Sequence, residues 1–336
     1  MILSRAPTRI SLGGDGTDLA SYYSKYGGLL IAGAINKYCT LLASKRFYPD
    51  IRLSYSQTEQ KEKVSEIEHR IFRVALEMTG INGGVELHST ADVPSGCGLG
   101  TSSSFTVALL NALHTYRREF VSQEKLAEEA CFIEINKLGE PIGKQDQYMA
   151  AYGGLSCLTF EKDGKVIVEP LQITNDSLDQ MENNLIMFFT GKERSASEIL
   201  LEQDTKSKEN DPAMIENLHQ IKDIGLCTKK YLEQGNLDML GELFHTHWEL
   251  KKKRSSKMSN PLVDECYNLA RAKGAIGGKL IGAGGGGFLL FYCKNGNKHG
   301  VIEAMTKMGL KWERFRFDFD GTKILVNTHS RTQGSI

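Results

Sequence analysis

PSGCGLGTSSS, residues 94–104, places three glycines and then a run of hydroxyl side chains directly before an apolar segment that extends to about Tyr116. This apolar segment has the composition of a buried helix. The first backbone N–H groups of a helix have no intrahelical partner and carry partial positive charge, so they stabilise an anion. Glycines let a loop wrap a phosphate without Cβ clashes, and hydroxyls in the first turn can donate to the phosphate or ligate Mg²⁺. The stretch therefore favours a phosphate-binding loop, and a serine-capped helix after a flexible loop is the alternative.

Two better-known nucleotide motifs do not fit this stretch. A Walker A loop carries a lysine after its last glycine, whereas Thr101 follows Gly100 here. A dinucleotide-binding fingerprint needs an acidic residue at the end of a second parallel strand about 20 residues further on, and no such residue follows. A nucleotide-binding oxidoreductase is therefore disfavoured.

The composition of the whole chain narrows the class of protein. Its 336 residues are enough for one large domain or two ordinary ones, and 41 acidic residues balance 41 basic ones. A balanced charge argues against a nucleic-acid binder, whose surface is basic. The seven cysteines are scattered, and no apolar run approaches the roughly 20 residues that a bilayer span needs. We therefore expect a cytoplasmic protein with reduced thiols that binds neither nucleic acid nor membrane, as a monomer or a homodimer.

The order of the predicted elements indicates an α+β fold. The first third is rich in strands, among them two short strands at residues 2–5 and 9–12 that Pro7 separates. Residues 195–271 are mainly helical, and a strand, a glycine run, a strand, a helix and two closing strands follow. This order favours two lobes with a boundary between residues 175 and 195.

Two further glycine-rich stretches accompany the loop, namely APTRISLGGDGTD at residues 6–18 and KLIGAGGGGF at residues 279–288. In order and approximate spacing, the three stretches resemble the three motifs of the GHMP small-molecule kinases, a superfamily that includes galactokinase, homoserine kinase and the mevalonate and phosphomevalonate kinases. The resemblance covers almost the whole chain. It implies ATP and Mg²⁺ as cofactors. It also implies a two-lobed fold, with an N-terminal mixed α/β lobe over residues 1–180 and a C-terminal helix-rich α+β lobe over residues 181–336.

The second motif of this superfamily wraps the ATP phosphates at a helix N-terminus. Carried over residue by residue, the implied nucleotide-binding positions are Pro94, Gly96, Cys97, Gly98, Leu99, Gly100, Thr101, Ser102 and Ser103. Ser102 matches the hydroxyl that ligates Mg²⁺. The third motif maps to residues 282–287, where Gly284 and Gly285 would shape the loop beside the phosphates and the substrate.

The resemblance also implies which residues carry the chemistry. Asp146, in Gly-Lys-Gln-Asp-Gln-Tyr, matches the segment with the catalytic aspartate of the superfamily, and Glu134 lies twelve residues earlier, where galactokinase-like members place a Mg²⁺ carboxylate. Arg9 falls where galactokinase has an arginine close to that aspartate. A fixed cation there would favour ionised Asp146 and offset charge on the transferred group. The alternatives are a polar helix cap for Asp146, a solvated helix face for Glu134 and a surface arginine.

The first motif most resembles that of the sugar-1-kinases, particularly the D-glycero-D-manno-heptose 7-phosphate kinases, although Asp15 stands where those usually have glycine. Carboxylates in a glycine turn suit capture of sugar hydroxyls, and a plain turn is the alternative. The resemblance implies four substrate-binding positions here, which are Asp15, Gly16, Thr17 and Asp18. The implied reaction is ATP-dependent phosphorylation of the anomeric hydroxyl of the heptose 7-phosphate to the 1,7-bisphosphate, for nucleotide-activated heptose and surface polysaccharide synthesis.

A second stretch, Thr190-Gly-Lys-Glu-Arg-Ser-Ala, resembles a segment of the same subgroup. Its polar side chains Lys192, Arg194 and Ser195 are candidates to hold the phosphate that the sugar already carries. The basic run at residues 251–254, in contrast, has the pattern of a solvated helix end, where cations are favourable anyway, and a binding patch is the alternative.

Other functions remain open at this point. Another GHMP kinase would act on fucose, galactose or an isoprenoid alcohol, and a non-catalytic relative would only bind its ligand. The small-molecule partner expected here is a sugar phosphate.

Overall fold

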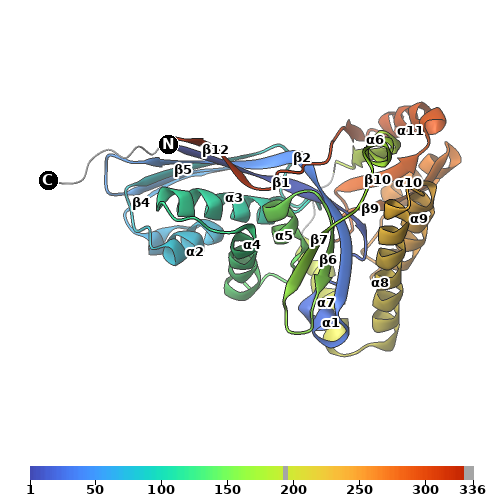
Figure 1. The fold of residues 1–336 in the computed structure, drawn as a ribbon, viewed down its shortest axis with the longest axis horizontal. Coiled ribbons are helices and arrows are strands. Elements are labelled where there is room, and N and C mark those ends of the chain that lie inside the picture. Colours follow the sequence, from blue (N-terminus) through green and yellow to red (C-terminus); the bar gives the residue numbers. More distant parts are fainter. Residues whose placement is uncertain (192–195, 329–336) are drawn as a thin grey trace.

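A computed structural model describes residues 1–191 and 196–328 of the chain (Figure 1). The strands are β1 (Ile2–Gly13), β2 (Gly28–Lys45), β3 (Ile51–Ser54), β4 (Thr58–Lys61), β5 (Val85–Ala91), β6 (Leu155–Phe160), β7 (Val166–Pro170), β8 (Leu185–Phe189), β9 (Ala275–Leu280), β10 (Phe288–Cys293), β11 (Lys311–Glu313) and β12 (Lys323–Asn327). The helices are α1 (Ala20–Tyr26), α2 (Arg70–Thr79), α3 (Thr101–Tyr116), α4 (Gln123–Cys131), α5 (Gln145–Tyr152), α6 (Asn175–Asn184), α7 (Ala196–Lys208), α8 (Pro212–Glu233), α9 (Asp238–Lys252), α10 (Pro261–Ala272) and α11 (Asn295–Lys307). A short 3₁₀ turn, Val64–Glu66, precedes α2, and a π-helical segment, Phe132–Lys137, continues α4.

The larger sheet is organised around the 18-residue strand β2. β1 pairs with β2 along its length, while on the other side β6 pairs with the first half of β2 and β5 with the second half. The last strand, β12, returns to pair with β1, and among the described strands of this sheet only β3 and β5 pair in parallel. Strand β1 is continuous, so the prediction of two short strands was wrong. Pro7 is accommodated because the register with β2 shifts between Pro7 and Thr8, where a missing N–H is tolerated.

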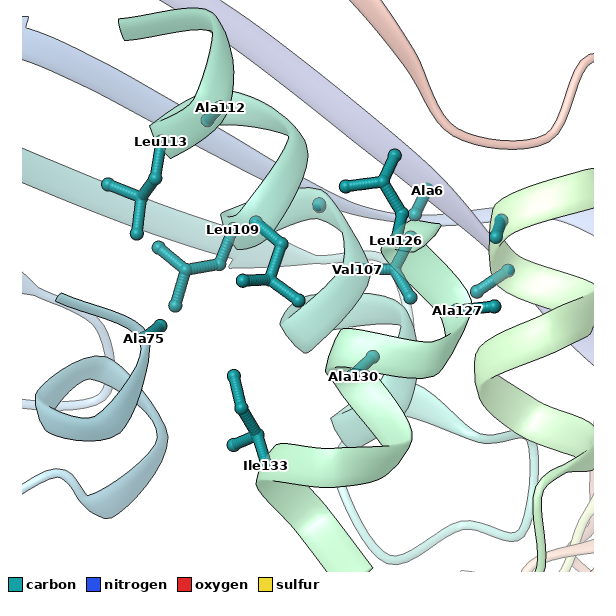
Figure 2. Close-up of a cluster of buried hydrophobic side chains, with 14 of the residues drawn as sticks. Ala6, Ala75, Val107, Leu109, Ala112, Leu113, Leu126, Ala127, Ala130 and Ile133 are labelled. Carbon is teal, nitrogen blue, oxygen red and sulfur yellow. The ribbon is translucent and has the colours of Figure 1, made fainter. Parts of the chain in front are cut away.

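Helices α2 to α5 cover one face of this sheet, and α3 lies at their centre (Figure 1). Figure 2 shows Val107, Leu109 and Leu113 of α3 pointing toward side chains of α2 and α4. Most side chains of α3 are buried, because neighbouring elements surround the helix. The buried hydroxyl of Ser104 in this helix is hydrogen-bonded, with the carbonyls of Gly100 and Pro7 as its acceptors. The N-terminus of α3 is therefore held firmly against β1.

The second sheet has the order β11-β8-β10-β9, is antiparallel throughout, and packs with α9, α10 and α11. Helix α8 packs against β1 and β2 of the first sheet and against α9, which packs on the second sheet. The sheet and helix content confirms the predicted α+β architecture. The division into residues 1–180 and 181–336 stays a prediction; β8 opens the second sheet at Leu185, whereas β12 belongs to the first. Among the described residues, no helix combines the length and the apolar character that a bilayer crossing needs.

Candidate active site

A cleft of about 580 Å³ at the N-terminus of α3 brings the three glycine-rich stretches together. Its walls include Arg9, Asp15, Gly16 and Asp18 of the first stretch, Gly96, Gly98, Gly100, Thr101, Ser102 and Ser103 of the second, Gly282 and Ala283 of the third, and the carboxylates Glu134 and Asp146. The predicted catalytic and metal residues and six of the nine predicted phosphate-loop residues therefore converge, although they come from segments far apart in the sequence.

The loop before α3 is built so that backbone rather than side chains faces the cleft. Gly96, Gly98 and Gly100 all have positive φ, at 75°, 86° and 77°. A Cβ on Gly98 would lie 2.5 Å from the carbonyl oxygen of Ile281, so the second and third stretches pack backbone against backbone. Gly100 stands at the N-cap of α3 and offers no capping side chain, which leaves the first-turn amides to a ligand.

Three of the predicted phosphate-loop residues, Pro94, Cys97 and Leu99, do not line the cleft that the described residues form. Cys97 and Leu99 are fully buried in the apolar cluster beneath the loop, and the carbonyl of Pro94 accepts a hydrogen bond from Thr101 Oγ1 at 3.2 Å. Their contribution is to fix the loop's path. Similarly, Gly284 and Gly285 do not line the cleft; the N–H of Gly285 donates to Met258 O.

Glu134 lies on the π-helical segment and is 1% exposed. Ser102 Oγ donates to its Oε1 at 2.7 Å, and Gln147 Nε2 donates to its Oε2 at 2.7 Å. Burial raises the pKa of Glu134 to about 7, against the opposing effect of these hydrogen bonds. A buried carboxylate beside a hydroxyl matches the oxygen chemistry that Mg²⁺ prefers, and a cation there would supply the missing positive charge. Glu134 and Ser102 therefore fit the predicted metal site.

Asp146 lies in the first turn of α5, beside the N-terminus of α3. Arg9 Nε donates to Asp146 Oδ1 at 2.7 Å, Arg9 Nη2 lies 2.5 Å from the same oxygen, and Arg9 Nη1 donates to Gly98 O at 2.7 Å. A Cβ on Gly100 would lie 2.9 Å from Asp146 Cγ, so the carboxylate sits directly against the helix N-terminus. The guanidinium thus holds an exposed edge of a carboxylate beside the place where the loop would bind a phosphate.

Of the polar side chains in the first stretch, Asp18 lines the cleft, whereas Thr17 is buried and holds the loop in place. Asp18 lines the cleft, is 2% exposed, and accepts hydrogen bonds from the N–H of Gly16 and from Gln145 N and Nε2. Burial and the neighbouring charge of Asp146 raise the pKa of Asp18 to about 6. Thr17, in contrast, is fully buried, and its hydroxyl donates to Gly14 O and Leu29 O. Thr17 therefore anchors the loop to β2.

Asp15 is the centre of a buried charge cluster. Both of its oxygens lie 3.0 Å from Lys279 Nζ, and Oδ2 lies 3.5 Å from Lys251 Nζ. Burial raises the pKa of Asp15, but the charge of Lys279 and of two further basic side chains outweighs it and holds this pKa well below its usual range. Its role as a ligand of sugar hydroxyls stays a prediction, since the carboxylate already has these partners.

The interpretation of residues 251–254 as a solvated helix end was wrong for two of the four. Lys251 and Arg254 are 1% and 3% exposed and line the cleft, while Lys253 is exposed. The sequence does carry a signal. Buried residues of α9 recur at Leu240, Phe244, His247 and Trp248, and Lys251 continues this stripe. Lys192, Arg194 and Ser195 lie outside the described residues.

Gly143 offers a direct test of the place of Asp18 in substrate binding. A Cβ at this position would lie 1.9 Å from Asp18 Oδ2. For the sugar and ATP that the resemblance implies as substrates, we expect Gly143→Ala to displace the carboxylate and to raise the KM of the sugar about tenfold or more, with the KM of ATP unchanged. Gly300→Ala is the control because nothing lies within 4 Å of that Cβ. An unchanged sugar KM in steady-state kinetics would separate Asp18 from substrate binding.

Comparisons with known proteins show which family the chain resembles. Residues 65–154 match the GHMP kinases N terminal domain, and residues 228–310 match the GHMP kinases C terminal region. The chain is 32% identical over 335 residues to the D-glycero-alpha-D-manno-heptose 7-phosphate kinase of Campylobacter jejuni, covering 96% of this chain and 98% of that protein. It is 24% identical over 324 residues to the galactokinase of Pyrococcus furiosus, covering 85% and 87%.

Among solved structures, a D-glycero-D-manno-heptose 1-phosphate kinase from Bacteroides thetaiotaomicron superposes with a TM-score of 0.81 at 25% identity, over 97% of this chain and 99% of that one. The fold, the three motifs in their order and the full-length sequence match lead to one conclusion: the chain belongs to the GHMP kinase family.

Proposed function

We propose that this GHMP kinase transfers the γ-phosphoryl group of ATP to the anomeric hydroxyl of D-glycero-D-manno-heptose 7-phosphate, giving the 1,7-bisphosphate. The Campylobacter relative, which matches nearly the whole chain, is a heptose 7-phosphate kinase, and the Bacteroides structure is called a heptose 1-phosphate kinase. The two names differ in the position of the phosphate, but both describe a heptose phosphate. A kinase for such a sugar would feed synthesis of nucleotide-activated heptose for surface polysaccharide.

The observation that carries this proposal is the place of Asp146. Its carboxylate is held by Arg9 against the N-terminus of α3, and Gln145, the residue before it, binds Asp18 of the first stretch. A phosphate on the α3 amides and a sugar beside Asp18 would therefore both border one carboxylate. Phosphoryl transfer depends mainly on such positioning and on charge stabilisation.

The nucleoside of ATP would occupy the part of the cleft that His69, Ile71, Leu138 and Ile142 line. This region combines an aromatic ring with aliphatic side chains, which suits a base and a ribose. Arg70 Nη2 donates to Leu138 O at 2.7 Å and so ties the two walls of this region together. The phosphates would then extend from it to the glycine loop.

Each catalytic residue then has one task. Asp146 accepts the proton of the sugar hydroxyl while the hydroxyl oxygen forms a bond to the γ-phosphorus, and the bond from that phosphorus to the bridging oxygen breaks to release ADP. Arg9 holds the Asp146 carboxylate in place and offsets negative charge on the phosphoryl group. Glu134 and Ser102 would hold Mg²⁺, which neutralises phosphate charge when it is bound.

The test is turnover of purified protein with ATP, Mg²⁺ and heptose 7-phosphate, with phosphorus NMR to locate the new phosphate. We expect one ADP for each sugar and a new phosphate on the anomeric carbon. Galactose, fucose and mevalonate are offered in parallel. Faster turnover of any of these, or a new phosphate at another carbon, would contradict the proposed substrate.

A further inference from the structure

The cleft has a strongly basic inner end that the proposed transfer step does not use. Lys251 lies in the last turn of α9, and Arg254 follows shortly after it; both are buried and line the cleft. Arg254 lies against the first glycine-rich stretch, because a Cβ on Gly16 would lie 2.7 Å from Arg254 Nη1. The basic end is thus in direct contact with the loop that carries Asp15 and Asp18.

The positive charges at this end exceed their carboxylate partners. Lys251 and Lys279 both form ion pairs with Asp15, which lies closer to Lys279 than to Lys251. Lys251 Nζ also donates to the carbonyls of Leu280 and Gly282. Within the described ranges, no carboxylate forms an ion pair with Arg254, whose Nε and Nη1 donate to the amide oxygens of Asn217 and Gln203 at 3.0 and 3.3 Å. Asp15 and Asp18 act on the Arg254 guanidinium from a longer distance. Three buried cations near two carboxylates leave positive charge that a ligand with negative charge would stabilise.

One donor of this cluster is also left without a hydrogen bond. Arg254 Nη2 is buried and has no partner among the described residues. Buried polar atoms are almost always paired, and an unpaired one in a ligand cleft points to a group that the ligand supplies. A guanidinium recognises phosphate oxygens particularly well because its planar fork matches their geometry.

The first stretch connects this end of the cleft to the reacting end. Asp18 accepts hydrogen bonds from Gln145, which precedes Asp146 in the sequence. Gly16 O accepts one from Gln203 Nε2, and the Oε1 atom of the same Gln203 accepts one from Arg254. A sugar that lies along this loop therefore has Asp146 near one end and Arg254 near the other. Such a site suits a sugar with its existing phosphate far from the attacking hydroxyl.

We propose that Arg254, with Lys251 beside it, binds the phosphate that the sugar substrate already carries and so selects phosphorylated over free sugars. This inference rests on the proposed function, because it assumes that the substrate is a sugar phosphate. It adds residues that sequence reasoning placed outside the site.

Lys251 gives the proposal a readout that a purely structural role would not move. Burial lowers the pKa of Lys251 to about 7, with Asp15 acting to raise it and Lys279 and Arg254 to lower it further; His247 also faces this cluster. A bound phosphate would favour protonated Lys251. We expect the Kd of heptose 7-phosphate to rise as pH increases above 7, by up to about tenfold per pH unit, while the Kd of the unphosphorylated heptose stays constant.

The decisive experiment measures binding by calorimetry for the wild-type protein, Arg254→Gln and the control Lys253→Gln, which removes an exposed charge from the same segment. Each protein is titrated with heptose 7-phosphate, with free heptose and with a non-hydrolysable ATP analogue. We expect Arg254→Gln to weaken heptose 7-phosphate binding about 10- to 100-fold and the other two ligands less than threefold. The control should match the wild type.

Several results would overturn the proposal. Equal weakening of both sugars would make Arg254 a structural residue, and weakening of the ATP analogue alone would assign it to the nucleotide. If Arg254→Gln does not fold by circular dichroism, Arg254→Lys, which keeps the charge but loses the fork, should still weaken only heptose 7-phosphate binding. If the wild type phosphorylates heptose 7-phosphate but these selective losses are absent, only this subsite is wrong. If it binds free and phosphorylated sugar equally, the proposed substrate fails with it.

Discussion

Replacing Asp146 with asparagine is expected to lower kcat by about 10²- to 10⁴-fold while nucleotide affinity stays the same. Asparagine has the shape of aspartate, and it keeps an oxygen that can accept from Arg9. It has no negative charge and does not take a proton from the sugar hydroxyl. The Asp146 carboxylate contacts Arg9 and borders Gly100, but the loop amides themselves do not depend on it.

An ADP-coupled assay measures kcat for this variant, and calorimetry with a non-hydrolysable ATP analogue measures the Kd. Asp179→Asn is the matched control because Asp179 is exposed on α6, away from the cleft. A variant with near-normal kcat would remove Asp146 from the chemistry. A loss of nucleotide affinity as large as the loss of kcat would instead make Asp146 part of the binding loop.

Replacing Glu134 with glutamine is expected to lower kcat at least about 100-fold at saturating Mg²⁺ and yet to stabilise the metal-free protein above pH 7. The loss of kcat follows because the variant lacks the only buried carboxylate beside Ser102 in the described part of the cleft. The stabilisation follows from burial, which raises the pKa of Glu134 to about 7 from an ordinary value of 4.5.

The sign of the pH effect is fixed by this raised pKa. Between pH 4.5 and 7 the folded wild type binds a proton at Glu134 that the unfolded chain has released, so folding stability falls as pH rises through this window. At pH 8 the accumulated cost is on the order of 3 kcal/mol. Glutamine avoids it, and the amide of Gln147, whose Oε1 has no partner among the described residues, can turn to accept from the new NH₂.

Calorimetric melting at pH 5 and pH 8, with and without Mg²⁺, measures this effect. The difference in Tm between Glu134→Gln and the wild type should be larger at pH 8 than at pH 5, and Mg²⁺ should stabilise only the wild type. Glu128→Gln, on the exposed face of α4, is the control. Equal differences at both pH values, or Mg²⁺ stabilisation of the variant, would separate Glu134 from the metal.

Local sequence patterns predicted the parts of this site that depend on backbone conformation. The glycines at residues 96, 98 and 100 indicated a loop with positive φ before a buried helix, and the structure has this loop. The lining of the cleft by Asp146, Glu134 and Arg9 was expected only through the family resemblance. Their spacing carries no local signal of contact, since Arg9 and Asp146 are 137 positions apart.

Buried charges were the part that sequence reasoning missed. A lysine or arginine is normally solvated, so Lys251 and Arg254 looked like a helix end. They can be buried because Asp15, which follows β1, comes close to the end of α9 in the folded chain. The continuity of β1 was missed for a related reason. The register shift that accommodates Pro7 depends on pairing with β2, which the local sequence does not show.

The most direct test of the account is a crystal structure of this protein with a non-hydrolysable ATP analogue and Mg²⁺. We predict that the triphosphate lies within hydrogen-bonding distance of the backbone amides between Gly98 and Ser102, with Asp146 beside the γ-phosphate. A nucleotide bound in any other cavity, or phosphates remote from both the α3 N-terminus and Asp146, would contradict it.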